Sequence, residues 1–260
     1  MASYDIFGNI AIIKSEGKTK KEKLLEAKEL LKKPGIKTVL EKSTNIKGIY
    51  RTIKTKYLAG EKNLIALLKE NSCLFKFNVE KCYFSPRLSN ERQKISEKIN
   101  QNDKVLVMFA GVGAYPIVIY KYKKPKKIIA IEINKECCKY FKENLKLNKI
   151  QEKIIEIIEG DVRKKINKGF IKKFGKFDVI VMARPNLKES FLKYALKVSK
   201  KGTRIFYYGF CRNSELNKLL DQLKKEATDN KNKIKFVEIA KAGEIAPYKY
   251  RYRIEIKVIK

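Results

Sequence analysis

The sequence has no histidine and no tryptophan among its 260 residues. Without histidine, serine–histidine and cysteine–histidine catalysis is excluded, and so is every metal site that needs an imidazole ligand. The five cysteines form no CxxC pair, and their odd number argues against a disulfide framework or a zinc cluster. We therefore expect no metal, and free thiols in the reducing environment of the cytoplasm.

Long apolar runs and acidic residues are also scarce. No stretch reaches the roughly 18 apolar residues that a membrane span needs, and the first residues do not resemble a signal peptide. Lysine and arginine number 61 against 28 aspartates and glutamates, a formal net charge of +33. Such a charge repels itself unless a polyanion neutralises it, so a nucleic acid is the expected partner, with a lysine-rich proteome as the alternative explanation.

The first 80 residues have the pattern of a small α+β domain. Ile10–Ile13 form an apolar strand pattern, and a helical pattern runs over 20–32 until Pro34-Gly35 ends it. Three short strands are predicted after it, at 37–40, 49–54 and 73–79. We place the domain boundary at residue 80, which leaves residues 81–260 as a second, larger domain.

The second domain alternates apolar strand patterns with helical ones. Its strand patterns lie at 105–108, 127–133, 153–158, 177–182, 203–208 and 235–239. Because parallel neighbours need crossover helices, this alternation predicts an α/β fold. From Tyr248 to Val258 apolar and charged residues alternate, and no helical pattern separates this stretch from the strand before it. The result is a seven-stranded, Rossmann-like sheet whose last strand is antiparallel, as in class I methyltransferases.

Three features lie at the ends of three successive strands. The loop 109–113 follows the first parallel strand, and Gly111 and Gly113 in it permit a tight turn against a ligand. Glu132 ends the second strand, where an acid accepts ribose hydroxyls, and Asp161 follows the third, where an acid accepts an adenine amino group. Since open α/β sheets bind ligands at this edge, a nucleotide-type cofactor is expected; helix caps and solvated loop acids are the alternative.

The sequence around these features resembles the archaeal and eukaryotic tRNA guanine-37 N1-methyltransferase family, often called Trm-five. The similarity covers nearly the whole chain. It rests on these segments: YDIFGNIA at 4–11, YLAGE at 57–61, YFSPR at 83–87 with Glu91-Arg92, FAGVG at 109–113, ENLKLN at 143–148 and APY at 246–248. Together with the strand-end features, the resemblance predicts an S-adenosylmethionine site formed by Phe84, Arg92, Phe109, Ala110, Gly111, Gly113, Glu132, Asp161, Val162 and Pro185.

The resemblance implies methyl transfer from S-adenosylmethionine to N1 of guanosine 37 in tRNA, by a monomer. Some archaeal members also methylate C7 of the wyosine intermediate, and a sister group transfers an aminocarboxypropyl group from the same cofactor. That transfer, and a non-catalytic RNA-binding protein on the same fold, are the alternatives. The small domain with which many members contact the outer corner of tRNA is missing from this sequence, so the anticodon stem is expected to provide most contacts.

Methylation at guanine N1 requires loss of the N1 proton and stabilisation of charge on O6. Glu91 aligns with the family's proposed base, and Arg51 with the arginine that assists at O6. Helical spacing with Ile95 and Ile99 points Glu91 toward the buried side of its helix, with Ser89 or Asn90 as the expected cap. The alternative for Glu91 is a helix-terminal charge, and for Arg51 a solvated strand residue.

Tyr83 and Phe84 are expected to stack on the guanine and the cofactor, with core packing as the alternative. Two positions depart from the family. Val107 replaces an acid, and Ala183-Arg184-Pro185 replaces Asn-Leu-Pro, a change similar to that of the wyosine branch. Loss of the asparagine amide fits a second, bulkier substrate, although sequence drift has the same result.

Overall fold

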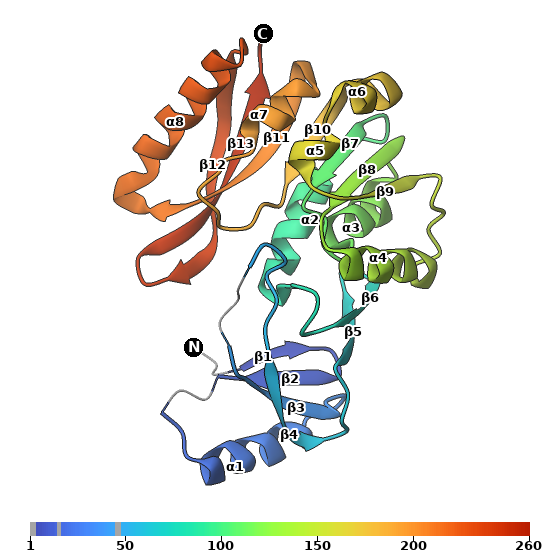
Figure 1. Cartoon of the computed structure of the whole chain (residues 1–260), viewed down its shortest axis with the longest axis vertical. Coiled ribbons are helices and arrows are strands. Elements are labelled where there is room, and N and C mark those ends of the chain that lie inside the picture. The colour runs from blue at the N-terminus through green and yellow to red at the C-terminus, as the bar shows by residue number, and fades with distance from the viewer. Residues whose placement is uncertain (1–3, 15–16, 45–47) are drawn as a thin grey trace.

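Three sheets organise the computed structural model, which describes residues 4–14, 17–44 and 48–260 (Figure 1). A four-stranded sheet lies at the N-terminal end, a seven-stranded sheet forms the larger part, and a two-stranded hairpin lies between them. This arrangement confirms the predicted α/β fold with a small N-terminal α+β domain.

The N-terminal sheet has the strand order β1-β2-β3-β4. Its neighbours pair antiparallel except for β2 and β3, which run parallel because helix α1 connects them. A capping box begins this helix, since Thr19 accepts from the Glu22 amide and Glu22 accepts from the Thr19 amide. The elements are β1 (Tyr4–Phe7), β2 (Ile10–Ile13), α1 (Lys20–Leu31), β3 (Thr38–Lys42) and β4 (Thr55–Gly60).

The strand predicted at 49–54 was wrong. Arg51 has a φ angle of 55°, in the left-handed region, which a residue other than glycine rarely adopts in an extended strand. The chain turns at 48–51, and the fourth strand begins only at Thr55. As a result, Arg51 lies on a turn that faces the larger domain rather than within the N-terminal sheet.

The hairpin of β5 (Ile65–Glu70) and β6 (Cys73–Asn78) packs against helix α4 (Lys135–Leu147). Two asparagines one helical turn apart make this contact by pairing with the backbone of β6. Asn144 accepts from the Lys76 amide at 2.7 Å and donates to its carbonyl, and Asn148 does the same with Leu74. The ENLKLN segment therefore joins the hairpin to the large domain; the boundary at residue 80 stays a prediction.

The large sheet has the strand order β12-β13-β11-β10-β7-β8-β9. The five strands from β11 to β9 run parallel, and β13 is antiparallel to both of its neighbours, β11 and β12. The predicted antiparallel last strand is confirmed. The strands are β7 (Lys104–Met108), β8 (Lys127–Glu132), β9 (Ile155–Glu159), β10 (Phe177–Met182), β11 (Ser199–Arg212), β12 (Ile234–Ala246) and β13 (Lys249–Val258).

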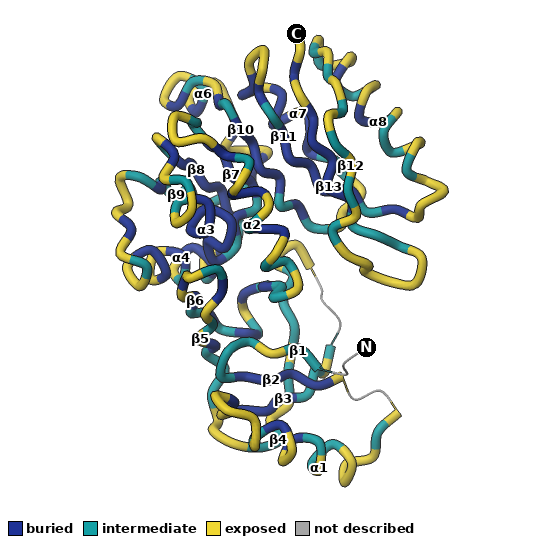
Figure 2. Tube along the Cα trace, turned by 180° about the vertical axis from the view of Figure 1, so that it is seen from behind, coloured by how far each residue is buried: buried dark blue, intermediate teal, exposed yellow. Residues whose placement is uncertain are grey.

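Helices cover both faces of this sheet and enclose two cores (Figure 2). Successive side chains of a strand alternate between faces, so Val105 and Val107 lie in one core and Leu106 and Met108 in the other. Val107 is fully buried, and an acid there would need its own buried partner. Besides α4, the helices of this domain are η1 (Pro86–Leu88), α2 (Ser89–Glu97), α3 (Ala114–Lys123), α5 (Val162–Lys165), α6 (Lys168–Phe174), α7 (Leu192–Lys197), η2 (Asn213–Glu215) and α8 (Leu216–Asp229).

Among the residues that the structure describes, no helix combines the length and the apolar character needed to cross a membrane.

Candidate functional site

A pocket opens at the carboxyl edge of the parallel strands. The loops after β7, β8 and β10 form its floor, and the turn at 49–51 and the segment 83–92 close it from the other side. The pocket brings together nine of the predicted residues: Arg51, Tyr83, Phe84, Arg92, Phe109, Ala110, Gly111, Glu132 and Pro185. Four others do not line it: Glu91, Gly113, Asp161 and Val162.

Glycine is favoured at positions 111 and 113 of the loop after β7 for two different structural reasons. Gly113, with a φ of 89°, begins helix α3, and a Cβ on it would lie 2.2 Å from the Phe141 ring. It therefore allows α3 to approach α4 closely. A Cβ on Gly111, with a φ of 57°, would lie 3.8 Å from the Tyr83 carbonyl oxygen, an ordinary contact, so the left-handed backbone rather than lack of space favours glycine there. This conformation directs the Gly111 amide at Glu132, to which it donates at 2.7 Å.

Glu132 ends β8 as a buried carboxylate with an exposed fraction of 8%. Its Oε2 accepts from the Gly111 amide and its Oε1 accepts from the Asn134 amide at 2.8 Å. Burial raises the pKa of Glu132, while these backbone hydrogen bonds act in the opposite direction. A carboxylate has about four lone-pair sites, so these backbone bonds leave acceptor capacity for a ligand, and Glu132 lines the pocket.

Asp161 is engaged away from the pocket wall. Its side chain accepts from the Arg163 amide at 2.8 Å as the cap of α5, and it forms an ion pair with the Arg163 guanidinium at 2.5 Å. The hydrogen bond from the Arg163 side chain to the carboxylate lowers the pKa of Asp161. Val162 is buried in the second core. Adenine recognition by this pair stays a prediction, and it requires Asp161 to share its oxygens with Arg163.

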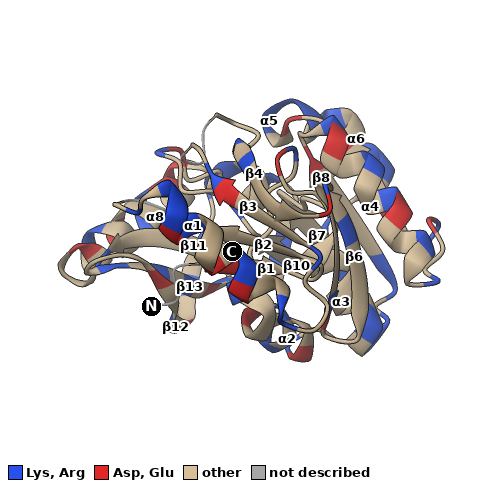
Figure 3. Cartoon of the chain, turned by 90° about the horizontal axis from the view of Figure 1, so that it is seen from below, with Lys and Arg blue, Asp and Glu red and all other residues tan. Residues whose placement is uncertain are grey.

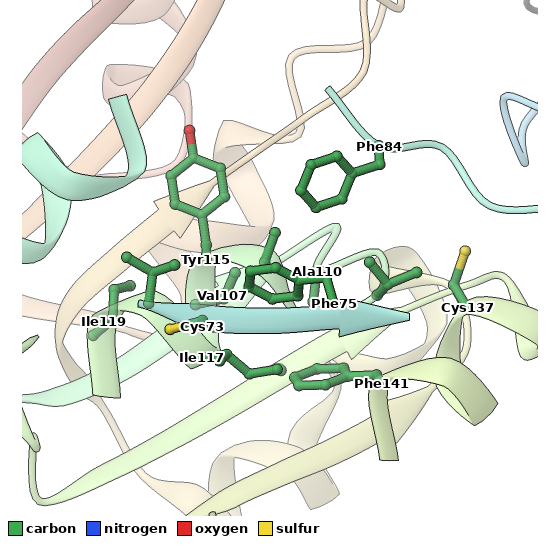
Figure 4. Close-up of a cluster of buried hydrophobic side chains, with 14 of the residues drawn as sticks. Cys73, Phe75, Phe84, Val107, Ala110, Tyr115, Ile117, Ile119, Cys137 and Phe141 are labelled. Carbon is green, nitrogen blue, oxygen red and sulfur yellow. The ribbon is translucent and has the colours of Figure 1, made fainter. Parts of the chain in front are cut away.

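Aromatic rings and guanidinium groups alternate on the opposite wall. The Arg51 guanidinium lies 4.4 Å from the centre of the Tyr83 ring, and its Nε is buried without a hydrogen-bond partner. Phe84 stacks on Phe77 at 5.0 Å and is almost fully buried, so it packs in the first core as well as lining the pocket. Figure 4 shows Phe84 and Tyr115 on the same side of that core, with the Tyr115 hydroxyl directed away from it.

Arg92 is held by a buried acid. It forms a two-pronged ion pair with Glu70 of β5 at 2.6 and 2.5 Å and also donates to the Ser85 carbonyl at 2.9 Å. The exposed fractions of the two side chains are 3% and 6%. Arg92 thus fixes the segment 83–92 to the hairpin, and its charge is already neutralised. Direct contact with a cofactor stays a prediction.

Glu91 is buried, as its helical spacing predicted, and it lies behind the pocket wall. Both of its carboxylate oxygens accept from Nη1 of Arg253, at 2.9 and 3.1 Å, and Oε1 also accepts from the Tyr208 hydroxyl at 2.9 Å. The expected cap by Ser89 or Asn90 was wrong. Helix α2 continues directly from the 3-10 turn η1, and Leu88 stands at its cap position without a side-chain hydrogen bond.

Two models of known protein families together match almost the whole chain. Residues 66–235 match the TRM5/TYW2 methyltransferase domain, and residues 1–63 match the TYW2 N-terminal domain. The chain belongs to the TRM5/TYW2 methyltransferase family. This agrees with the resemblance seen in the sequence motifs.

Individual relatives of this TRM5/TYW2 chain are named for tRNA position 37. It is 36% identical over 207 residues to the tRNA (guanine(37)-N(1))-methyltransferase Trm5b of Methanocaldococcus jannaschii, covering 79% of this chain but only 58% of that relative. It is 32% identical to the tRNA (guanine(37)-N(1))/4-demethylwyosine(37)-methyltransferase Taw22 of Nanoarchaeum equitans, over 99% of this chain and 100% of the relative. A solved complex of aTrm5 with tRNALeu superposes with a TM-score of 0.84 at 30% identity, covering 100% of this chain and 72% of that one.

Several pocket residues of this family member escaped the sequence analysis. Tyr208 and Phe210 of β11, Arg251 of β13 and Tyr115 of α3 all line the pocket. Tyr208 had a usable signal, because it stands at the end of a predicted strand, at the same sheet edge as Glu132. Arg251 had no such signal, since an antiparallel strand reaches this edge at its beginning.

Arg184, in the departure from Asn-Leu-Pro, fills space rather than leaving it open. It is buried, and it donates to the carbonyls of Tyr208, Leu187 and Glu189 at 3.2, 2.6 and 2.5 Å. It thereby fixes the loop that follows β10, while the small side chain of Ala183 faces the pocket. Within the described residues, no group of three or more cysteines and acids has the geometry of a metal site.

Proposed function

We propose that this chain transfers a methyl group from S-adenosylmethionine to N1 of guanosine 37 in tRNA. The observation that supports this best is one pocket that joins the loop of Gly111 and Glu132 to the stacked pair of Arg51 and Tyr83. The first pair is suited to a ribose and the second to a flat base whose O6 gains charge. Family membership and the names of the relatives point to the same reaction.

The residues present fit the cofactor. Gly111 offers a backbone without steric obstruction, Glu132 has spare acceptor sites, and the aromatic ring of Phe109 lies edge-on to Phe191 at 5.0 Å beside them. When bound, S-adenosylmethionine supplies an activated methyl group on a positively charged sulfur. The protein's own part is to orient the base against it, to exclude water and to take the N1 proton.

The tRNA partner follows from charge and from the family. The excess of lysine and arginine over acids amounts to +33, and the ribbon of Figure 3 marks lysine and arginine positions on several helices and loops rather than in one terminal segment. A surface of this kind neutralises phosphates by releasing counterions. The expected monomeric state and cytoplasmic location stay predictions.

The test is methyl transfer to defined tRNA. Transcripts with guanosine or adenosine at position 37 are incubated with the chain and with cofactor labelled on the methyl group, and the tRNA is then digested to nucleosides. We expect labelled 1-methylguanosine from the guanosine transcript only. Label on neither transcript, with a folded protein, contradicts the proposal.

A second candidate is aminocarboxypropyl transfer, which the match of residues 1–63 to the TYW2 N-terminal domain favours. Cofactor labelled in its carboxypropyl carbons distinguishes the two, because methyl transfer leaves that label in solution. Bulk tRNA carrying the wyosine intermediate also tests C7 methylation, for which the Taw22 relative and Ala183 provide the support.

A further inference from the structure

The predicted base and the predicted substrate are separated by one side chain. Glu91 does not line the pocket, whereas Tyr208 does, and the Tyr208 hydroxyl donates to Glu91 Oε1 at 2.9 Å. Tyr208 belongs to β11 and Glu91 to α2, so the contact joins two distant elements. Tyr208 is therefore a pocket-lining residue that is hydrogen-bonded directly to the predicted base.

Glu91 is not free to swing into the pocket. Nη1 of Arg253 donates to both of its oxygens, and Nη2 of Arg253 donates to Glu238 at 2.7 Å. The exposed fractions of the Arg253 and Glu91 side chains are 5% and 9%. Breaking such a buried pair would leave an uncompensated charge, which is strongly unfavourable. The carboxylate is thus fixed at one hydrogen bond from Tyr208.

The Tyr208 hydroxyl has the bonding capacity to connect the two. A phenol has one donor proton and two lone pairs. The proton is donated to Glu91, and one lone pair accepts from the Tyr115 hydroxyl at 3.0 Å. One lone pair remains for an N–H donor in the pocket. Burial raises the pKa of Tyr208 well above its ordinary range and that of Tyr115 to about 12, so neither accumulates as an anion.

We propose that Tyr208 relays the guanine N1 proton to Glu91. The N1–H bond breaks as a new O–H bond forms on Tyr208, and the original Tyr208 proton passes to Glu91 Oε1. The electron pair left on N1 forms the bond to the methyl carbon, and the pair of the broken carbon–sulfur bond stays on sulfur. The inference rests on the proposed function, because the methyl donor and the guanosine are the ones named there.

The decisive comparison uses single-turnover methylation of guanosine-37 tRNA by Tyr208→Phe, Glu91→Gln and the double variant. Each single change interrupts the relay, so each rate should fall ~10²-fold or more, with cofactor and tRNA affinity little changed. The double variant should be no slower than the slower single variant, because residues that act as a unit are not additive. If the fold-losses in rate of the two single variants multiply in the double variant, the relay is overturned. A Tyr208→Phe rate equal to that of the wild type overturns it as well.

Tyr207→Phe is the matched control. Tyr207 is the preceding residue of the same strand, equally buried but in the core on the opposite face. Losing its hydroxyl should leave the rate unchanged. If Tyr207→Phe loses as much as Tyr208→Phe, the effect comes from strand packing, and the relay is overturned.

A measurement on the wild-type protein covers the case in which Tyr208→Phe does not fold. Rates in mixtures of light and heavy water should curve with deuterium content, since two protons move in the relay. A linear dependence indicates one moving proton and contradicts it. Methylation by the wild type at all is a separate result, and its absence rejects the proposed function together with the relay.

Discussion

Glu132 accepts hydrogen bonds from backbone amides and also lines the pocket proposed to hold the cofactor. Replacing it with alanine should weaken S-adenosylmethionine binding by about 1.5–3 kcal/mol, the usual contribution of a hydrogen bond to a charged group. Calorimetry measures this directly. Glu159→Ala is the control, because Glu159 ends the neighbouring strand β9 but is exposed. Equal affinity for wild type and Glu132→Ala would remove the ribose assignment.

Cofactor affinity should also depend on pH through the same carboxylate. Burial raises the pKa of Glu132, so its protonation begins at a higher pH than that of an ordinary glutamate. The protonated acid accepts fewer hydrogen bonds, so affinity should fall as the pH is lowered, and the fall should begin above the pH range in which an ordinary glutamate titrates. Glu132→Gln does not titrate, and its affinity should be lower but flat with pH. A wild-type profile as flat as that of the glutamine variant contradicts the assignment.

Arg51 should act through the shape of its guanidinium as well as its charge. Lysine keeps the charge but loses the planar fork and the stacking on Tyr83, so Arg51→Lys should have a single-turnover rate between wild type and Arg51→Ala. Lys56→Ala, which removes an exposed cation from nearby β4, serves as control. Wild-type activity of Arg51→Ala would return this residue to the solvated role considered from the sequence.

At the residue scale, the sequence predicted that the Glu91 side chain is buried, but not which residues bind it. The spacing of Glu91, Ile95 and Ile99 fixed which face of α2 is buried, since helical periodicity is a local property. Tyr208 and Arg253, which bind Glu91, lie 117 and 162 residues away in the chain. No periodicity connects positions so far apart, and only the order of strands in the sheet brings them together.

Among the elements, the hairpin β5–β6 depends on one buried ion pair. Glu70→Ala leaves the Arg92 guanidinium buried without its partner, which should lower the free energy of unfolding by about 3–5 kcal/mol. Urea denaturation measures the change. Glu29→Ala breaks the exposed pair with Lys32 and should cost at most about 1 kcal/mol. Similar values for the two variants would show that burial of the Arg92 pair is not what stabilises the hairpin.

The elements that the sequence predicted well are those with a strong period. The parallel strands and the last strand were found near their true positions, because apolar runs and strict alternation distinguish them. The segment 49–54, predicted as a strand, begins in a turn, and the left-handed backbone of Arg51 is not visible in its pattern of apolar and polar residues. Strand β5 was missed, because its apolar residues do not alternate cleanly with polar ones.

On the scale of the whole molecule, charge should dominate the affinity for tRNA. Each phosphate that a basic side chain neutralises releases counterions, so the logarithm of the association constant should fall linearly with the logarithm of salt concentration. With six or more such contacts, affinity should drop ~10³-fold between about 50 and about 200 mM salt. Cofactor affinity, measured in the same buffers, should change little. A shallow slope for tRNA would mean that the charge of +33 serves another purpose.

The position of Arg253 also determines when the site is completed during synthesis. Glu91 is made early, but the arginine that holds it belongs to β13, the last strand of the chain. A nascent chain on the ribosome, or one shortened before residue 253, contains the loop of Gly111 and Glu132 without a fixed Glu91. Such a chain also lacks the strand that lies between β12 and β11, so the carboxylate proposed to take the N1 proton is held in place only after β13 has joined the sheet.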